Sequence, residues 1–319
     1  LSLVTKTYPH GHEKELLQFL PKLDKDRFGN YYKIIPGDDT TMFTSHLDTA
    51  DRKQLVTKLL SSVDSDGDEH IITDGNSILG ADDKAGVAVM LYMMHNKVPG
   101  LYYFFLGEEV GGIGSNLLSG DYTKTSYLEN IKRCVSFDRR KTVSVITRQV
   151  GRQCCSDEFA NALCDEYNKS GLDLSPDAGG IYTDSASFID DIPECTNISV
   201  GYNFEHTAKE TQNISYLDRL AKASVNVDWS SLPTNRKIGM SSELIKKYKV
   251  VIDEIKKVVY ELEVKMVGTD DRIYIRLDLD NAEIGTIAET LTQVQMILNK
   301  NKIYPAVIFD ETYIKIELR

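Results

Sequence analysis

Five short segments of the chain carry carboxylate and imidazole side chains in an order that predicts metal chemistry. In chain order they are Thr44-Ser45-His46-Leu47-Asp48, Gly80-Ala81-Asp82-Asp83-Lys84, Gly107-Glu108-Glu109, Phe137-Asp138 and Glu205-His206-Thr207. Each segment alone is a common pattern, and its ordinary interpretation is a surface side chain or a packed one. Together they supply two imidazoles, one shareable carboxylate and two further carboxylates, which fill the coordination of two zinc ions. The ordered set therefore predicts a two-metal hydrolase.

The types of these residues suggest a role for each. Two cations roughly 3.5 to 4 Å apart need a short carboxylate that bridges them, and we assign this role to Asp82. Each ion then takes one imidazole and one terminal carboxylate, which leaves a position for a shared water that loses its proton near neutral pH. Of the adjacent acidic pair, Glu108 is the expected general base and Glu109 a metal ligand. Asp48 is expected to accept the imidazole N–H of His46 that does not face metal.

The same segments, with their neighbours, resemble a known family. The motifs "TSHLDTAD", "ILGADDKAGVAVML", "FFLGEEVGGIGS", "VSFDRR" and "FEHTAKETQNISYLDRLAK" are similar to those of the co-catalytic zinc exopeptidases, which include tripeptidase T, leucyl-type aminopeptidases and glutamate carboxypeptidases. The resemblance implies one zinc on His46, Asp82 and Asp138 and the other on Asp82, Glu109 and His206, with cobalt or manganese as substitutes. It also implies Glu108 as the base and Asp48 as the residue that orients His46. In several relatives an Asp at the position of Asp138 accompanies aminopeptidases, which favours cleavage at the amino end.

Two features depart from the family pattern. Tripeptidase-T-like relatives insert a lid and dimerisation domain between the last carboxylate ligand and the final His, and the interval from Asp138 to His206 has no room for one. Leucyl-type relatives often carry a Tyr before the final His to polarise the scissile carbonyl, whereas this chain has Glu205. We expect Tyr182 or Tyr202 to substitute for it. The predicted substrate-binding residues are Tyr182, Asp184 and Tyr202.

Composition and charge exclude several classes of function. The chain has 319 residues, of which 41% are hydrophobic, and can bury a substantial core. It shows no apolar run long enough to span a membrane and no signal-peptide pattern in residues 1–20, so we expect a cytoplasmic protein. The net charge of −11 argues against nucleic acid or an anionic membrane as a partner. Five cysteines without metal-type spacing predict reduced, packed side chains.

Hydrophobic periodicity predicts an α/β fold: a mixed sheet sandwiched by helices, zinc exopeptidase-like, followed by a small C-terminal α+β domain. The polar segment "SSLPTNRKIG" marks the boundary. We therefore expect a catalytic domain without a lid at 1–233 and an accessory domain at 238–319. In the accessory domain the pattern predicts helices over 241–265 and 281–300, a strand over 272–280 and a terminal strand or hairpin. Oligomerisation or docking is favoured over a second substrate-binding element.

Three other motifs have ordinary interpretations. His10 and His12 are spaced like metal ligands, but we expect a solvated turn there because no carboxylate set accompanies them. The segment "DSDGDEH" at 64–70 resembles a calcium loop but lacks the glutamate that ends such loops, so a hairpin is expected. "GEEVGGIGS" lacks the Lys-Ser/Thr ending of a phosphate loop.

The sequence as a whole favours a di-zinc aminopeptidase that removes N-terminal residues from short peptides. An amidohydrolase that deacylates a small N-acyl substrate uses the same chemistry and remains open. A catalytically silent, metal-binding structural subunit is the alternative from a different class. We expect no nucleic-acid or membrane partner, and a homo-oligomer through the C-terminal domain is the predicted assembly.

Overall fold

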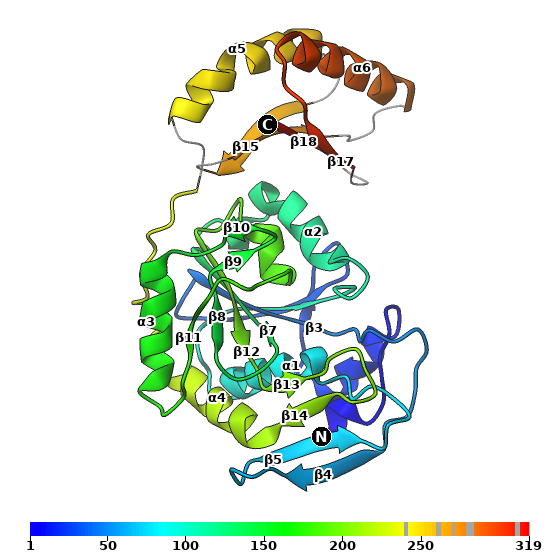
Figure 1. Ribbon diagram of the computed structural model, residues 1–319, viewed down its shortest axis with the longest axis vertical. Helices are drawn as coiled ribbons and strands as arrows, with labels where there is room; N and C mark the ends of the chain where they lie inside the picture. The colour runs from blue at the N-terminus through cyan, green and yellow to red at the C-terminus, as the bar shows by residue number, and fades with distance from the viewer. Residues whose placement is uncertain (239–241, 260–262, 270–271, 279–283, 310–312, 319) are drawn as a thin grey trace. The chain divides into compact units, whose positions relative to one another are not determined.

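The computed structural model describes residues 1–238, 242–259, 263–269, 272–278, 284–309 and 313–318. The chain divides into two compact units, Leu1–Arg236 and Lys237–Arg319 (Figure 1). Within the described ranges, no helix combines the length and the apolar character that crossing a membrane requires.

The N-terminal unit is built on an eight-stranded mixed sheet with the strand order β1-β2-β6-β3-β7-β12-β8-β11. The strands are β1 (Asp24–Lys25), β2 (Tyr31–Ile35), β3 (Thr41–His46), β6 (Gly100–Phe105), β7 (Arg133–Arg139), β8 (Ser144–Ile146), β11 (Ser175–Asp177) and β12 (Glu194–Ser199). The four central strands β6, β3, β7 and β12 run parallel. Strand β2 is antiparallel to β6, and β8 is antiparallel to β12. Parallel central strands bring their carboxyl ends to one edge of the sheet.

Helices cover both faces of this sheet, so its strands are apolar on both sides. The helices are α1 (Ala81–His95), α2 (Ile113–Gly120), α3 (Asp157–Asn168) and α4 (Ile214–Asn226), and the 3-10 helices are Ser2–Val4, Glu13–Phe19, Tyr122–Lys124, Ser126–Leu128 and Asp184–Phe188. Phe43 and Val135 lie in one core with side chains of α1, α3 and α4. Met42 and Cys134, their neighbours in sequence, lie in a second core with Leu118 of α2. Successive side chains of a strand point to opposite faces, which explains the division. The predicted sandwich is confirmed.

Two smaller sheets complete the N-terminal unit. Strands β4 (Leu59–Val63), β5 (Glu69–Thr73), β13 (Tyr202–Asn203) and β14 (Thr211–Asn213) form an antiparallel sheet, and β9 (Arg148–Gln149) pairs with β10 (Arg152–Gln153). Strands β4 and β5 form the hairpin expected at 64–70.

The backbone at the start of α1 sets the directions of Asp82 and Asp83. Gly80 adopts a left-handed conformation (φ 69°), and Asp82 and Asp83 both have non-helical backbone angles. Regular helix therefore begins only after Asp83. Asp83 Oδ1 accepts the backbone N–H of Gly86 at 3.2 Å and so caps the helix, while Asp82 is left free to point elsewhere.

In the C-terminal unit, helices cover one face of an antiparallel sheet (Figure 1). Its described elements are α5 (Ser242–Val258), β15 (Glu263–Thr269), β16 (Arg272–Asp278), α6 (Ile284–Lys300), β17 (Ala306–Phe309) and β18 (Tyr313–Leu318), with the strand order β15-β16-β18-β17. The helix expected to reach residue 265 ends at Val258, so that part of the prediction is wrong. Residues 263–265 instead belong to β15 and pair with β16. Residues 260–262, also part of that predicted helix, lie outside the described residues.

Candidate active site

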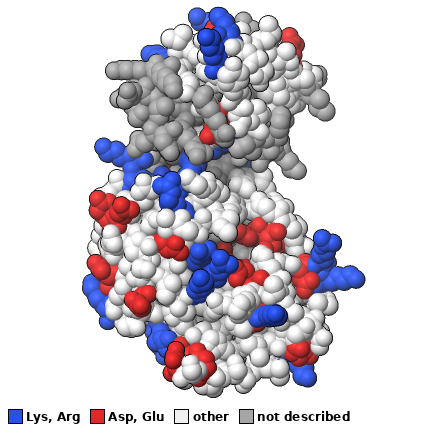
Figure 2. All heavy atoms as spheres, viewed as in Figure 1, with Lys and Arg blue, Asp and Glu red and all other residues white. Residues whose placement is uncertain are grey.

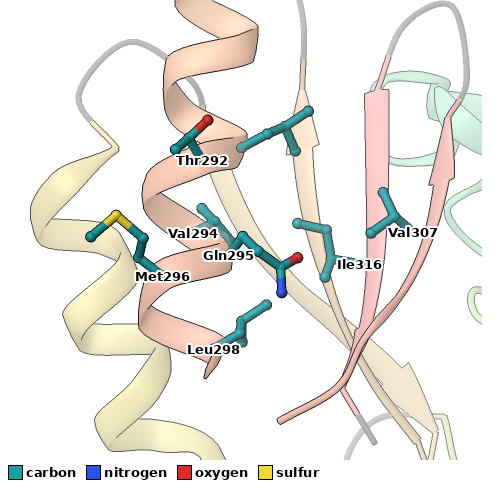
Figure 3. Close-up of a pocket in the computed structure, with 8 residues that line it drawn as sticks. Thr292, Val294, Gln295, Met296, Leu298, Val307 and Ile316 are labelled. Carbon is teal, nitrogen blue, oxygen red and sulfur yellow. The ribbon is translucent and has the colours of Figure 1, made fainter. Parts of the chain in front are cut away.

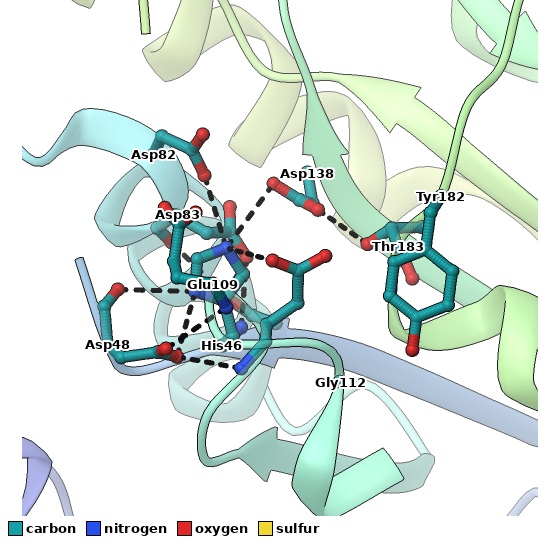
Figure 4. A network of polar contacts seen from close by, with 12 residues as sticks. His46, Asp48, Asp82, Asp83, Glu109, Gly112, Asp138, Tyr182 and Thr183 are labelled. Atoms are coloured by element: carbon teal, nitrogen blue, oxygen red, sulfur yellow. Dashed lines mark hydrogen bonds and ion pairs between the residues drawn. The ribbon is translucent and has the colours of Figure 1, made fainter. Parts of the chain in front are cut away.

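The site lies at the carboxyl ends of the parallel strands. His46 ends β3, Glu108 and Glu109 follow β6, and Asp138 lies near the end of β7. A pocket of about 190 Å³ opens there, and its lining includes Asp82, Glu108, Asp138 and His206. Ligands in open α/β sheets bind at this edge, outside the carboxyl ends of strands. All five predicted segments therefore meet in one place. Figure 4 draws polar contacts of four of them, labelled at His46, Asp82, Glu109 and Asp138.

A second pocket has no chemistry of this kind. It measures about 400 Å³ and lies in the C-terminal unit between α6 and the sheet (Figure 3). Its lining consists of Leu291, Thr292, Val294, Gln295, Met296, Leu298, Val307 and Ile316. None of these side chains is titratable or a common metal ligand. The pocket of about 190 Å³ in the N-terminal unit is therefore the candidate active site.

Asp82 lies between the two imidazoles. Its Oδ1 is 3.1 Å from Nε2 of His46, and its Oδ2 is 3.1 Å from Nε2 of His206. Each oxygen of one carboxylate thus faces a different ring. This is the arrangement expected of a carboxylate that bridges two metal ions.

Asp83, the next residue, is engaged elsewhere. Its carboxylate accepts the backbone N–H groups of His46, at 3.1 Å, and of Gly86. The hydroxyl of Ser45 also donates to it. Asp83 therefore holds β3 against the start of α1, and Asp82 is the acid of this pair that is free to bind metal.

Each imidazole has a second carboxylate nearby. Asp138 Oδ1 lies 3.7 Å from Nε2 of His46, and Glu109 Oε2 lies 3.0 Å from Nε2 of His206. The other oxygen of Glu109, Oε1, is buried and has no hydrogen-bond partner among the described residues. A buried carboxylate oxygen without a partner is costly unless a cation or a water satisfies it. The nitrogen and oxygen donors present fit two zinc ions.

Neighbouring groups orient Asp138. The hydroxyl of Tyr202 donates to Asp138 Oδ1 at 3.1 Å, and the hydroxyl of Thr183 donates to Oδ2. The side chain of Asn197 bonds both the backbone N–H and the carbonyl of Asp138, each at 2.9 Å. Metal ligands in proteins are commonly fixed by such outer contacts.

Asp48 performs two tasks. Nδ1 of His46 lies 3.2 Å from the backbone carbonyl of Asp48 and 3.3 Å from its side-chain Oδ1, so the orienting role stays a prediction that this geometry allows. The same carboxylate accepts the backbone N–H groups of Glu108 and Glu109, each at 3.1 Å. Lys84, which is buried, donates to the backbone carbonyl of Asp48 at 2.9 Å. Asp48 thus ties the His46 ring to the loop that carries both glutamates.

The electrostatics of the site favour cations. Burial, followed by repulsion from acids that include Asp138 and Asp184, raises the pKa of Glu108 to about 10. Burial and the charge of Asp82 likewise raise the pKa of Asp138 to about 6. So many acids in one buried place repel one another, and bound divalent ions would reverse this effect.

The imidazoles respond in the opposite direction. Hydrogen bonds to Asp82 and Glu109 raise the pKa of His206 to about 11. For His46, burial disfavours the charged ring, but contacts with Asp138, Asp48 and Asp82 outweigh it and raise its pKa well above the usual value. The same carboxylates that raise these pKa values would favour a bound cation at either ring.

The three predicted substrate residues have different surroundings. Tyr202 lines the pocket, but its hydroxyl is bonded to Asp138. Tyr182 also lines the pocket, and its ring extends away from Asp138 to a hydroxyl that bonds Ser187 at 3.0 Å (Figure 4). Asp184 is 1% exposed and does not line the pocket, and neither of its side-chain oxygens has a hydrogen-bond partner among the described residues. Burial raises its pKa to about 7.

Several residues at the site were missed at the sequence level. Glu210 accepts the backbone N–H groups of Gly80 and Asp82, at 2.8 and 3.0 Å, and so fixes the turn before α1. Its position, four residues after the proposed ligand His206, was a weak indication in the sequence that it lies near the site. Arg139 and Arg140 line the pocket directly after Asp138. The motif "FDRR" held both arginines, but nothing in it showed where they point.

The N-terminal histidines lie in an exposed turn, as expected, but carboxylates do accompany them, contrary to the expectation that none would. Nδ1 of His10 lies 2.7 Å from Glu13, and Nδ1 of His12 lies 3.1 Å from Glu15. Ligand atoms of His10, Glu13 and Asp48 lie within 4.8 Å of one another. Because Asp48 already bonds His46 and two backbone N–H groups, this cluster is a support behind the site.

Charged side chains of both signs share the surface of this unit. On the face drawn in Figure 2, basic and acidic side chains are interspersed over the N-terminal unit, and no extended basic area is visible there.

Solved structures of known peptidases share this fold. The aminopeptidase PepT from Bacillus cereus ATCC 10987 superposes with a TM-score of 0.57 at 16% identity, covering 70% of this chain and 95% of that one. A tripeptidase from Staphylococcus aureus gives 0.52 at 16% identity over 71% and 95%. The TET1 peptidase of Pyrococcus horikoshii, which can assemble into a tetrahedron or a large octahedral shell, gives 0.51 at 14% over 70% and 96%. The predicted zinc exopeptidase-like fold is confirmed, and identities this low establish the fold alone.

Similarity in sequence is more limited. No protein-family model matches the chain. The uncharacterized protein YqjE of Bacillus subtilis (strain 168) is 36% identical over 96 residues, which is 28% of this chain. The match spans 24% of that curated relative.

Proposed function

We propose that this chain is a metal-dependent hydrolase, specifically a di-zinc aminopeptidase that acts on short peptides. The observation that carries the proposal is the position of Asp82, whose two oxygens face His46 and His206 at equal distances of 3.1 Å. Asp138 lies beside His46 and Glu109 lies beside His206, so each proposed metal ion has one imidazole and one further carboxylate. The peptidase fold supports the same conclusion.

Zinc bound by these residues would supply a water of lowered pKa and a Lewis acid for the scissile carbonyl. The chain supplies the proton transfers. Glu108 lines the pocket, and its carboxylate takes a proton from the attacking water and delivers it to the leaving nitrogen. Asp48 keeps His46 in the tautomer that presents Nε2 to the metal.

Pocket size and ligand type favour a small substrate cleaved at its amino end. The volume of about 190 Å³ has room for little more than one or two residues. In several members of the family that the sequence resembles, an Asp at the position of Asp138 accompanies aminopeptidases. The hydroxyls of Tyr182 and Tyr202 are both bonded within the protein, so polarisation of the carbonyl falls to the metals or to another pocket residue.

A substrate panel tests this function. Metal-loaded protein should hydrolyse peptides with a free amino terminus, and should leave the same peptides intact when that amine is acetylated. Hydrolysis of N-acyl amino acids instead would favour the deacylase. Full metal occupancy without turnover of either set would favour the metal-binding structural subunit. Loading with cobalt or manganese provides a control for the identity of the metal.

We also propose that the C-terminal unit mediates assembly of a homo-oligomer. Its pocket is lined largely by apolar side chains, and Met296 of that pocket is 68% exposed. Met296→Lys should lower the mass measured by light scattering while metal content stays unchanged. An unchanged mass would argue against this surface as the contact.

A further inference from the structure

Two arginines stand on the wall of the candidate active site. Arg139 and Arg140 follow the proposed ligand Asp138 directly, where β7 ends, and both line the pocket. The chain carries a net charge of −11, and the proposed ligands make this region more acidic still. Two adjacent cations in the lining of a pocket of about 190 Å³ therefore need an explanation.

The contacts within the protein use only part of each guanidinium. Arg139 donates through Nη2 to the carbonyl of Gly179 at 3.1 Å, and the same nitrogen lies 3.6 Å from Asp177. Arg140 donates through Nη1 to Glu205 at 3.0 Å. A guanidinium has five N–H donors, and among the described residues these contacts occupy one terminal nitrogen of each. The remaining donors are available to a ligand in the pocket.

The two side chains differ in their exposure to solvent. That of Arg139 is 16% exposed and that of Arg140 is 44% exposed. An ion pair with a partly buried cation is screened less by water and salt than one at the surface. Arg139 is therefore the principal site for an anion, and Arg140 is a second cation beside it.

We infer that Arg139 and Arg140 bind a carboxylate of the substrate. Planar guanidinium groups match carboxylates in two-point hydrogen bonds, whereas a neutral peptide carbonyl gains little from two such cations. This inference rests on the proposed function and names the substrate class: short peptides that carry a carboxylate close to the scissile bond.

Two parts of a peptide can supply this carboxylate. One is the acidic side chain of an N-terminal Glu or Asp, and the other is the C-terminal carboxylate of a dipeptide. The substrate pairs Glu-Ala-amide against Gln-Ala-amide and Ala-Ala against Ala-Ala-amide separate the two sources. Each pair differs only in one carboxylate and its amide.

The test compares Arg139→Gln and Arg140→Gln with the native protein on these pairs. For one pair, native protein should prefer the carboxylate by about 10- to 100-fold in kcat/KM, the effect of hydrogen bonds to a charged group. Arg139→Gln should bring that preference close to one, mainly through KM. Arg219→Gln is the matched control, since Arg219 is 47% exposed, is paired with Asp68 and does not line the pocket.

Two outcomes would overturn the inference. One is a native protein with no preference within either pair, and the other is an Arg139→Gln variant that loses the same factor on carboxylate and amide substrates. The second result would place Arg139 at the scissile carbonyl instead. Calorimetric binding of free glutamate against glutamine, and of alanine against alaninamide, separates this inference from the proposed function. If no peptide is cleaved but a carboxylate still binds through Arg139, the function fails and the subsite stands.

Discussion

Asp48 accepts the backbone N–H of Glu108 at 3.1 Å through the oxygen, Oδ1, that also lies 3.3 Å from Nδ1 of His46. The proposed base and one proposed metal ligand are thus positioned by a single buried carboxylate. Small displacements of a base relative to its substrate cost much of its effect. Asp48 binds the backbone N–H of Glu108 and not its side chain. Replacing the side chain of Glu108 should therefore leave the loop in place.

Replacing Glu108 by Gln should therefore remove the base and leave the metals in place. Turnover should fall by roughly 10²- to 10⁴-fold, the usual contribution of a general base. Metal content, measured by elemental analysis, should stay near that of the native protein. Glu166→Gln is the control, because Glu166 is paired with Lys169 at the surface. Turnover close to native in the Glu108 variant would exclude it as the base.

Asp82→Ala should lose both metal ions, because Asp82 contacts both imidazoles and no other described residue does. Asp138→Asn is the comparison, since Asp138 serves only the half-site of His46 and its loss should weaken one ion selectively. Binding isotherms with zinc distinguish the two cases. Two tightly bound ions in Asp82→Ala would refute the bridging role.

Metal affinity should rise with pH across the neutral range. Contacts with Asp82 and Glu109 raise the pKa of His206 to about 11, and the pKa of His46 is also raised, so protons compete with zinc for both rings. Zinc needs neutral imidazoles, and binding must release these protons. Apparent affinity should increase about tenfold per pH unit for each proton released. Chelator competition between pH 6 and 8 measures this slope, and a flat profile would contradict it.

Gly86→Ala should destabilise the N-terminal unit. An added Cβ would lie 2.0 Å from the backbone carbonyl of Phe137 and 2.6 Å from Asp83, so α1 must move away from β7. We expect a loss of about 1 to 3 kcal/mol in the free energy of unfolding, as for other overpacked sites. Trp229 is the only tryptophan of the chain and is buried in the core of this unit, so its fluorescence follows this transition.

His95→Ala is the control for that experiment. His95 is exposed in the last turn of the same helix, and surface changes of this kind usually shift stability by less than about 0.5 kcal/mol. An equal loss in the free energy of unfolding in both variants would show that the close approach at Gly86 is not the cause of the loss.

Truncation after Lys237 should leave a folded protein that binds metal. Truncation after Pro233 should lower the free energy of unfolding. Glu194 is fully buried, and its carboxylate accepts the backbone N–H groups of Asn235 and Arg236 at 2.7 and 2.9 Å. The shorter chain loses these charge-assisted bonds, each worth about 1.5 to 3 kcal/mol. Unfolding followed by Trp229 fluorescence measures the difference.

The activity of the chain ending at Lys237 tests the role of the C-terminal unit. Activity on dipeptide-sized substrates should persist if residues 238–319 serve assembly. If fold and metal content remain but the smallest substrates are no longer cleaved, the accessory role is wrong and the C-terminal unit contributes to catalysis.

The sequence alone indicated the chemistry and the class of fold. The residue types at His46, Asp82, Glu109, Asp138 and His206 are those that zinc binds, and ligand chemistry depends on type before position. Short β-rich runs such as "LYYFFL", alternating with helical periods, predicted an α/β fold. Both inferences use local information, which any stretch of sequence carries.

The tertiary structure decided which of these residues face one another. Asp82 and Asp83 are adjacent and chemically identical, and only the turn before α1 directs one toward His46 and His206 and the other toward the helix end. The second task of Asp48, the anchoring by Glu210 and the place of Arg139 in the pocket likewise join segments far apart in sequence. Side-chain direction at such points is set by the packing of distant elements, and no local pattern encodes it.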